Sequence, residues 1–153
     1  MRWHTYYEPS TLSDEQVRAV EKELGVEFPN RYRELMMRCH GAQPKVPEQA
    51  DFWIDVDNTF MQTFLGGFLP LVAPESATLV DVYRTFLDAA DHGWSPNVVP
   101  FATTGDGDYF CFDYRSDPTQ PRVVYFAHEY FYRTGFVNIA ETYSAFVDDV
   151  LQS

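Results

Sequence analysis

The chain has 153 residues, of which 45% are hydrophobic and 22% charged, a composition typical of one folded domain and unlike that of a disordered protein. Its formal net charge is −12, and residues 48–117 alone contain twelve acidic and two basic residues, a net charge of −10. Such a segment repels phosphate groups, which argues against direct binding of nucleic acid or of a membrane surface and favours a basic protein partner.

The first two predicted elements are helices. Ser13 starts the pattern of a capping box, apolar residues follow at helical spacing, and Gly25 is typical of a helix end. A second helix is expected to start at Pro29, where the missing N–H of proline costs no hydrogen bond, and to end before Gly41. Residues 1–11 are then an amino-terminal extension that precedes the first helix.

The middle of the chain predicts a hairpin and a third helix. Two strand-like runs, Phe52–Val56 and Phe60–Leu65, flank Asp57-Asn58, which is typical of a tight turn. A further strand over 68–72 contains a proline, which restricts this strand to a sheet edge or a bulge. Apolar residues at helical spacing over 75–90 then predict a helix.

The carboxy-terminal third is rich in β-forming residues. The predicted strands are Val98–Ala102, Tyr109–Tyr114, Arg122–Ala127 and one more over 131–137. Asn138 is expected to cap a final helix, which carries a stripe of apolar residues. These elements indicate an α+β fold: a single domain with a mainly antiparallel sheet of about five to six strands, helices at both termini and one helix between strands.

Four sequence blocks carry a family resemblance. They are Leu24–Tyr32, continuing to Gly41; Val99–Ala102; Gly105–Asp113; and Val123–Glu129, followed by Ile139–Phe146. In their order and spacing the blocks resemble the SUKH superfamily, which includes bacterial immunity proteins against secreted toxins and a fungal regulator of cell-wall synthesis. The resemblance implies one domain over 1–153 that acts as a binding module without catalytic residues. Residues 44–75 match none of the blocks.

The segment Gly105–Asp108 has two functional interpretations and a structural one. A phosphate-binding loop needs a lysine and a following helix, and a calcium-binding EF-hand loop needs a glutamate at its twelfth position; the sequence has neither. A turn between two strands is therefore favoured, because glycine adopts positive φ at little cost. The histidines and cysteines also lack metal-ligand spacing, so no metal or cofactor is expected.

Asp55 and Asp57 alternate along the chain and share one face if the strand continues through them. Two such carboxylates act as an acid–base pair only where a pocket separates their pKa values. Nothing in the sequence supplies that pocket, and the chain has no Gly-x-Ser-x-Gly motif for a nucleophilic serine. An enzyme is therefore the least favoured class of function.

The cysteines and the amino terminus indicate where the protein works. Cys39 and Cys111 show no pattern of a disulfide framework and are expected to be free thiols. The amino terminus lacks the apolar segment of a signal peptide, and the longest uncharged run is too short to span a membrane. A cytoplasmic location is therefore expected.

These observations predict an immunity protein that neutralises a cognate secreted toxin domain, with a basic nuclease as the expected target. Inhibition is by stoichiometric binding through an acidic surface, because acidic side chains complement a phosphate-binding surface and steer association. The alternative is a non-enzymatic regulatory or scaffolding module that binds a host protein.

The expected partner-binding residues are acidic and aromatic residues of the central segment. They are Asp51, Trp53, Asp55, Asp57, Asp106, Asp108, Asp113, Tyr114 and Asp117. If they bind, charge reversal at Asp55 and Asp57 slows association more than charge reversal at Asp148 and Asp149. The alternative surface is apolar and centres on the aromatic residues of the segment Tyr125–Tyr132.

Overall fold

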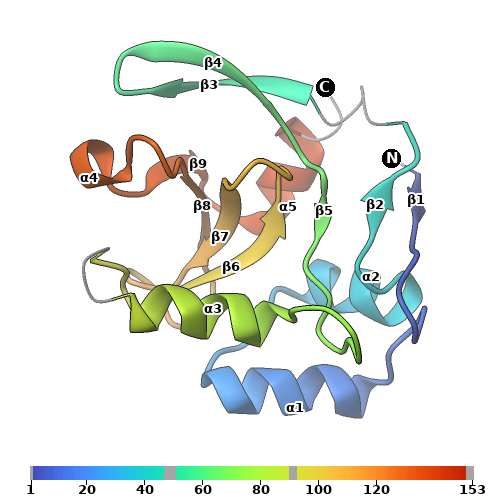
Figure 1. Ribbon diagram of the computed structural model, residues 1–153. Helices are drawn as coiled ribbons and strands as arrows, with labels where there is room; N and C mark the ends of the chain where they lie inside the picture. Colours follow the sequence, from blue (N-terminus) through green and yellow to red (C-terminus); the bar gives the residue numbers. More distant parts are fainter. Residues whose placement is uncertain (1, 47–50, 90–92, 151–153) are drawn as a thin grey trace.

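A five-stranded antiparallel sheet forms the centre of the computed structural model, which describes residues 2–46, 51–89 and 93–150 (Figure 1). In spatial order its strands are β5 (Gly67–Phe68), β6 (Val98–Thr103), β7 (Tyr109–Asp113), β8 (Arg122–Phe126) and β9 (Val137–Ala140). Two separate antiparallel pairs join β1 (Trp3–His4) to β2 (Gln43–Pro44) and β3 (Asp51–Val56) to β4 (Thr59–Phe64). The predicted α+β fold with a mainly antiparallel sheet is confirmed.

The predicted amino-terminal helices are α1 (Asp14–Leu24) and α2 (Asn30–Arg38). At the start of α1 the Ser13 hydroxyl accepts the Gln16 backbone N–H at 3.1 Å, and the Gln16 side chain accepts the Ser13 N–H at 2.9 Å. Gly25, with φ of +72°, ends this helix. The third helix, α3 (Leu79–Asp88), starts after its own capping box at Thr78, a few residues later than predicted.

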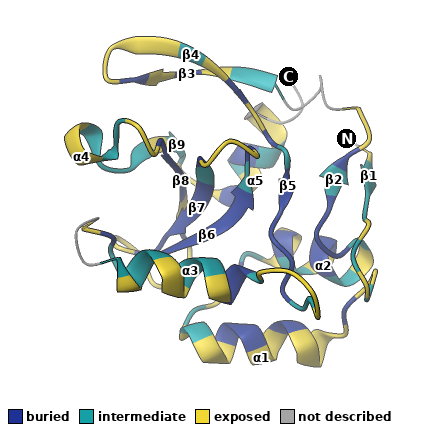
Figure 2. Ribbon diagram, viewed as in Figure 1, coloured by how far each residue is buried: buried dark blue, intermediate teal, exposed yellow. Residues whose placement is uncertain are grey.

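The sheet is buried on both faces, which explains the unbroken apolar runs of its strands. One face packs on α2 through the aromatic residues Tyr32, Phe101 and Phe112, with ring centroids of Phe101 and Phe112 4.0 Å apart. The other face packs on α3, where Phe86 stacks on Trp94 at 4.3 Å. Figure 2 shows the central strands buried and the helices exposed on their outer sides.

The carboxy-terminal region differs from the prediction. The segment expected to be a strand over 131–137 starts with a short helix, α4 (Phe131–Thr134), and strand β9 begins only at Val137. Asn138 therefore lies in a strand and caps no helix; its side chain donates to Glu141 at 3.1 Å. Pairing with the edge of β8 makes the segment around Asn138 a strand. The local sequence pattern could not predict this pairing, because the partner strand lies elsewhere in the chain.

The final helix is shorter than predicted. The Thr142 hydroxyl caps it by accepting the Ala145 N–H at 3.0 Å, and α5 (Tyr143–Ala145) continues into a π-helical turn, Phe146–Val150. The strand expected over 68–72 is also short, because Pro70 has no N–H to donate to the ladder beyond β5.

The amino-terminal extension is attached to the domain through His40, whose side chain is buried. The Nε2 atom of this imidazole accepts the backbone N–H of Leu71 at 2.9 Å, so the proton of the neutral ring lies on Nδ1, 2.7 Å from the Pro9 carbonyl oxygen. Burial lowers the pKa of His40. The neutral ring therefore joins the extension to the segment that follows β5.

This environment predicts that the protein loses stability in mildly acidic solution. The unfolded state, in which the pKa of His40 has its ordinary value of about 6.5, binds more protons than the folded state, so the free energy of unfolding falls as pH drops through that value. Urea denaturation at pH 7.5 and pH 5.5 measures the loss. The variant His40→Gln has no titrating side chain at this position, so its free energy of unfolding should fall less between the two pH values. An equal fall in both proteins would contradict this account.

Candidate binding surface

The β3–β4 hairpin presents two chemically different faces. Its inner face is apolar, with Ile54 and Val56 buried against the core. Its outer face alternates acidic and aromatic residues, because successive side chains of a strand point to opposite sides. Direct cross-strand neighbours on that outer face are Asp51 and Phe64, Trp53 and Gln62, and Asp55 and Phe60.

The turn fixes which side chains face outward. Asp57 and Asn58 both have positive φ, 55° and 61°, as a two-residue turn of type I′ requires. The hairpin and its turn are therefore as the sequence predicts. With this two-residue loop the register cannot slip by one residue, which would turn every outer side chain inward.

The outer face carries large apolar side chains in contact with water. The exposed fractions are 62% for Trp53, 72% for Phe60 and 40% for Phe64. We call Asp51, Trp53, Asp55, Phe60 and Phe64 the hairpin face. Contiguous exposed aromatic residues are unusual on a monomeric protein and mark interaction surfaces, and a tryptophan flanked by carboxylates has the amphipathic character of an interface.

A chain of hydrogen bonds anchors the hairpin to the central sheet. The Tyr125 hydroxyl donates to a carboxylate oxygen of Asp108 at 2.7 Å, and Thr63 on β4 donates to the Tyr125 oxygen at 2.9 Å. Burial raises the pKa of Tyr125, so this hydroxyl keeps its proton. The other Asp108 oxygen accepts the backbone N–H of His128 at 3.0 Å and lies 2.5 Å from the ring atom Nδ1.

A second anchor holds the tip of the hairpin. The Asp57 carboxylate pairs with the Arg133 guanidinium of α4 at 2.8 Å, and the same guanidinium lies over the rings of Tyr130 and Tyr132, 5.6 and 5.5 Å from their centroids. In Figure 1 the turn of the hairpin lies above α4. With both ends held, the hairpin face is a preformed surface.

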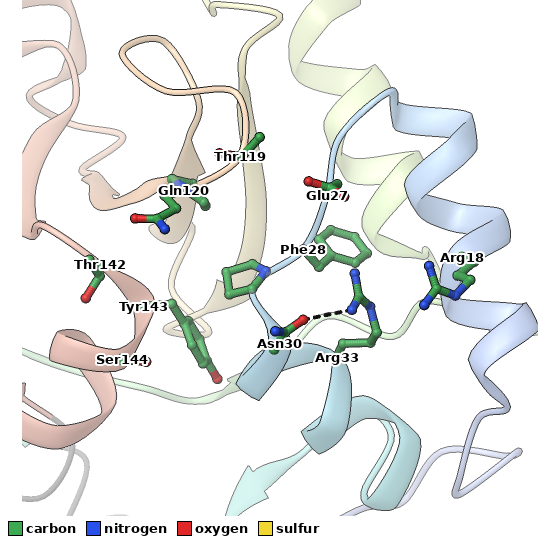
Figure 3. A pocket seen from close by; sticks show the side chains of 12 residues that line it. Arg18, Glu27, Phe28, Asn30, Arg33, Thr119, Gln120, Thr142, Tyr143 and Ser144 are labelled. Atoms are coloured by element: carbon green, nitrogen blue, oxygen red, sulfur yellow. Dashed lines mark hydrogen bonds between the residues drawn. The ribbon is translucent and has the colours of Figure 1, made fainter.

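A separate cleft of about 550 Å³ lies between the start of α2, the β7–β8 loop and the start of α5 (Figure 3). Its two guanidinium groups are already paired, Arg33 with Glu21 at 2.7 Å and Arg18 with Asp14 at 2.5 Å. Of the described residues that line it, Glu27 is the one carboxylate, and none is a histidine or a cysteine. The cleft therefore offers no carboxylate pair for acid–base chemistry.

The described residues also bear on metal-dependent and membrane-bound classes of function. No group of three or more histidine, cysteine, aspartate or glutamate side chains in that part of the chain is arranged to hold a metal ion. No helix within the described ranges is long and apolar enough to cross a membrane.

Comparison with known proteins identifies the family. The model of the SMI1 / KNR4 family (SUKH-1) matches residues 11–149. The chain belongs to this family. The resemblance seen in the sequence is thereby confirmed, and membership indicates a module that binds protein partners. No match was found among curated protein sequences.

A solved structure has a similar fold. It is described as a crystal structure of a protein from Pseudomonas syringae pv. tomato. It aligns with a TM-score of 0.53 at 15% sequence identity, over 98% of this chain and 92% of the other. At this identity the likeness concerns the fold alone.

Within this SUKH-1 chain, the predicted partner-binding residues separate into three groups. Asp51, Trp53 and Asp55 share the hairpin face, and Asp57 lies at its tip. Asp106 is exposed in the turn between β6 and β7. The remaining residues, Asp108, Asp113, Tyr114 and Asp117, have structural contacts of their own.

Three of these four side chains are buried. Asp108 anchors the hairpin, and the turn that contains it is the strand-to-strand turn expected, with positive φ at Gly105 and Gly107. The Asp113 carboxylate accepts a hydrogen bond from the Arg115 guanidinium at 2.9 Å. Burial acts to raise the pKa of Asp113, but the hydrogen bonds from Arg115 outweigh burial, so this pKa is lowered. The Tyr114 hydroxyl donates to the Glu27 carbonyl oxygen at 2.6 Å. We leave these three out of the proposed surface.

Asp117 is exposed in the β7–β8 loop, where it accepts backbone N–H groups of Thr119 at 2.9 Å and of Gln120 at 3.2 Å. These hydrogen bonds lower the pKa of Asp117. The loop borders the cleft at the start of α2, and no residue of the hairpin lines that cleft.

Sequence reasoning missed Phe60 and Phe64. The signal for them was present: a two-residue turn at Asp57-Asn58 sets the register, and Phe60, Gln62 and Phe64 then fall on the face that holds Trp53.

Proposed function

We propose that this SUKH-1 protein is an immunity protein that neutralises a cognate secreted toxin domain by stoichiometric binding through the hairpin face. The observation that carries the proposal is the outer side of the hairpin. There Trp53 is exposed between Asp51 and Asp55 on β3, and the exposed rings of Phe64 and Phe60 lie opposite these two acids on β4. Aromatic anchors supply binding free energy, and surrounding charges supply specificity and a fast association. The protein acts by binding, in the cytoplasm of the cell that makes it.

The chain's own charges indicate a basic partner. Most arginines form ion pairs with acidic residues other than Asp51 and Asp55. These arginines are Arg18, Arg31, Arg33, Arg84, Arg115, Arg122 and Arg133. Among the described residues, Asp51 and Asp55 have no such partner. A nuclease domain has a basic surface for phosphate groups, and we propose this class of toxin because its surface complements the hairpin face.

The alternative partner is a protein of the host cell, bound for regulation or scaffolding. The same surface serves either role, and the neighbouring genes distinguish them. An immunity gene is expected beside a gene for a large secreted toxin, whose toxin domain is then the probe for the experiments.

Charge reversal tests the role of the acidic residues. The double variant Asp51→Lys/Asp55→Lys should associate with the toxin domain about tenfold more slowly than the wild type at low salt. The difference should shrink at physiological salt, where the Debye length is about 8 Å. Stopped-flow measurement of the change in tryptophan fluorescence on binding gives the rate.

The control changes the same charge elsewhere. Glu34 on α2 and Asp88 on α3 are exposed, and in Figure 1 both helices lie away from the hairpin. Glu34→Lys/Asp88→Lys should slow association much less; equal slowing would mean that only net charge matters. The pairs suggested by the sequence are unsuitable, because Asp57 is paired with Arg133 and Asp148 with Arg31, at 2.8 and 3.0 Å.

A further inference from the structure

Strands β9 and β3 are among the strands of the described residues that lack a neighbour on one edge. Strand β9 ends the five-stranded sheet and pairs only with β8, and strand β3 pairs only with β4. The backbone N–H and C=O groups on such edges are available to an incoming strand, a common mode of peptide recognition.

A groove of about 360 Å³ lies between these two strands. It is lined by four consecutive residues of β3, three consecutive residues of β9 and one residue of the π-helical turn. The lining residues are Trp53, Ile54 and Asp55; Val137, Asn138 and Ile139; and Phe52 and Asp149. Strands on both sides of a groove suit the binding of a peptide in extended conformation.

The charges in the groove select the chemistry of that peptide. Asp55 and Asp149 are both exposed, and neither has an ion-pair partner among the described residues. The adjacent Asp148, by contrast, is paired with Arg31 at 3.0 Å. An arginine or lysine side chain in the groove would compensate both free carboxylates, whereas an acidic or phosphorylated segment would be repelled.

We propose that this groove receives an extended basic segment of the partner. The segment pairs with the edge of β9, its apolar residues contact Ile139 and Phe52, and its arginine or lysine side chains lie between Asp55 and Asp149. A second copy of this chain is a poor occupant, because its net charge is also −12. The inference rests on the proposed function, since the groove shares Trp53 and Asp55 with the hairpin face.

A model peptide tests the groove independently of the toxin. Titration of the ¹⁵N-labelled protein with acetyl-Val-Arg-Val-Arg-Val-Arg-amide should shift the amide signals of β9 and β3. Asp149→Asn should weaken the peptide about fivefold, whereas Asp148→Asn, the matched change one residue earlier, should weaken it less than about twofold. A glutamate peptide of the same length should not bind.

The backbone contribution is tested by N-methylation of the peptide amides, which keeps the positive charges and removes the N–H donors. Methylation should abolish the shifts at β9. Equal effects of Asp149→Asn and Asp148→Asn, shifts mainly outside β3, β9 and the π-helical turn, no binding, or unchanged binding of the methylated peptide would each overturn the inference. If the toxin domain still responds to charge reversal at Asp51 and Asp55 in that case, the proposed function stands without the groove.

Discussion

Replacing Phe146 by alanine is expected to lower the free energy of unfolding by about 3–5 kcal/mol. The ring is fully buried, with its centroid 5.3 Å from that of Phe110 and 6.1 Å from that of Phe101. It joins the carboxy-terminal helical segment to strands β6 and β7. Truncation removes the apolar surface of a whole ring and leaves a cavity that a packed aromatic core fills only in part.

Urea denaturation measures the loss, and Phe60→Ala is the matched control. Phe60 is 72% exposed, so its truncation should change the free energy of unfolding by no more than about 0.5 kcal/mol. An unchanged stability of Phe146→Ala would show that the helical segment does not pack on the sheet.

Local patterns were sufficient where an element depends on its own residues. The capping box at Ser13 defines α1, and the turn at Asp57-Asn58 with alternating neighbours defines the hairpin. Local patterns were insufficient where pairing with a distant strand determines whether a segment is a helix or a strand. Ile139 fits both a helical stripe and a strand, and the pairing of β9 with β8 selects the strand. The C-terminal helix is therefore capped by Thr142 rather than by Asn138.

Only part of the candidate surface could be predicted, because burial of a side chain also depends on residues far along the chain. The clustering of acids is visible in the sequence, but burial of a particular acid depends on its partners. Asp108 is a central acid whose partners, Tyr125 and His128, lie far along the chain, so no count of charges separates it from Asp55. The aromatic half of the hairpin face follows only from cross-strand register.

Replacing Trp53 by alanine is expected to weaken binding of the toxin domain by about 2 kcal/mol or more, which is about 30-fold in Kd. Trp53 is 62% exposed and lies at the centre of its strand, between Asp51 and Asp55. A tryptophan in this position buries a large rigid ring when a partner covers it. Its loss removes little packing inside the free protein, so thermal stability should be unchanged.

Two further exposed aromatic residues serve as controls. Tyr6, 79% exposed, lies in the amino-terminal extension, and Tyr132, 80% exposed, belongs to the alternative aromatic surface. Tyr6→Ala should bind as the wild type does. A greater loss from Tyr132→Ala than from Trp53→Ala would place the interface on the segment Tyr125–Tyr132.

Calorimetric titration of the toxin domain into the wild-type and Trp53→Ala proteins tests the central claim most directly. The wild type should saturate at a ratio of one to one, and the variant should bind about 30-fold more weakly with the same stoichiometry and an unchanged melting temperature. A Trp53→Ala protein that binds as tightly as the wild type would contradict the assignment of the hairpin face as the binding surface.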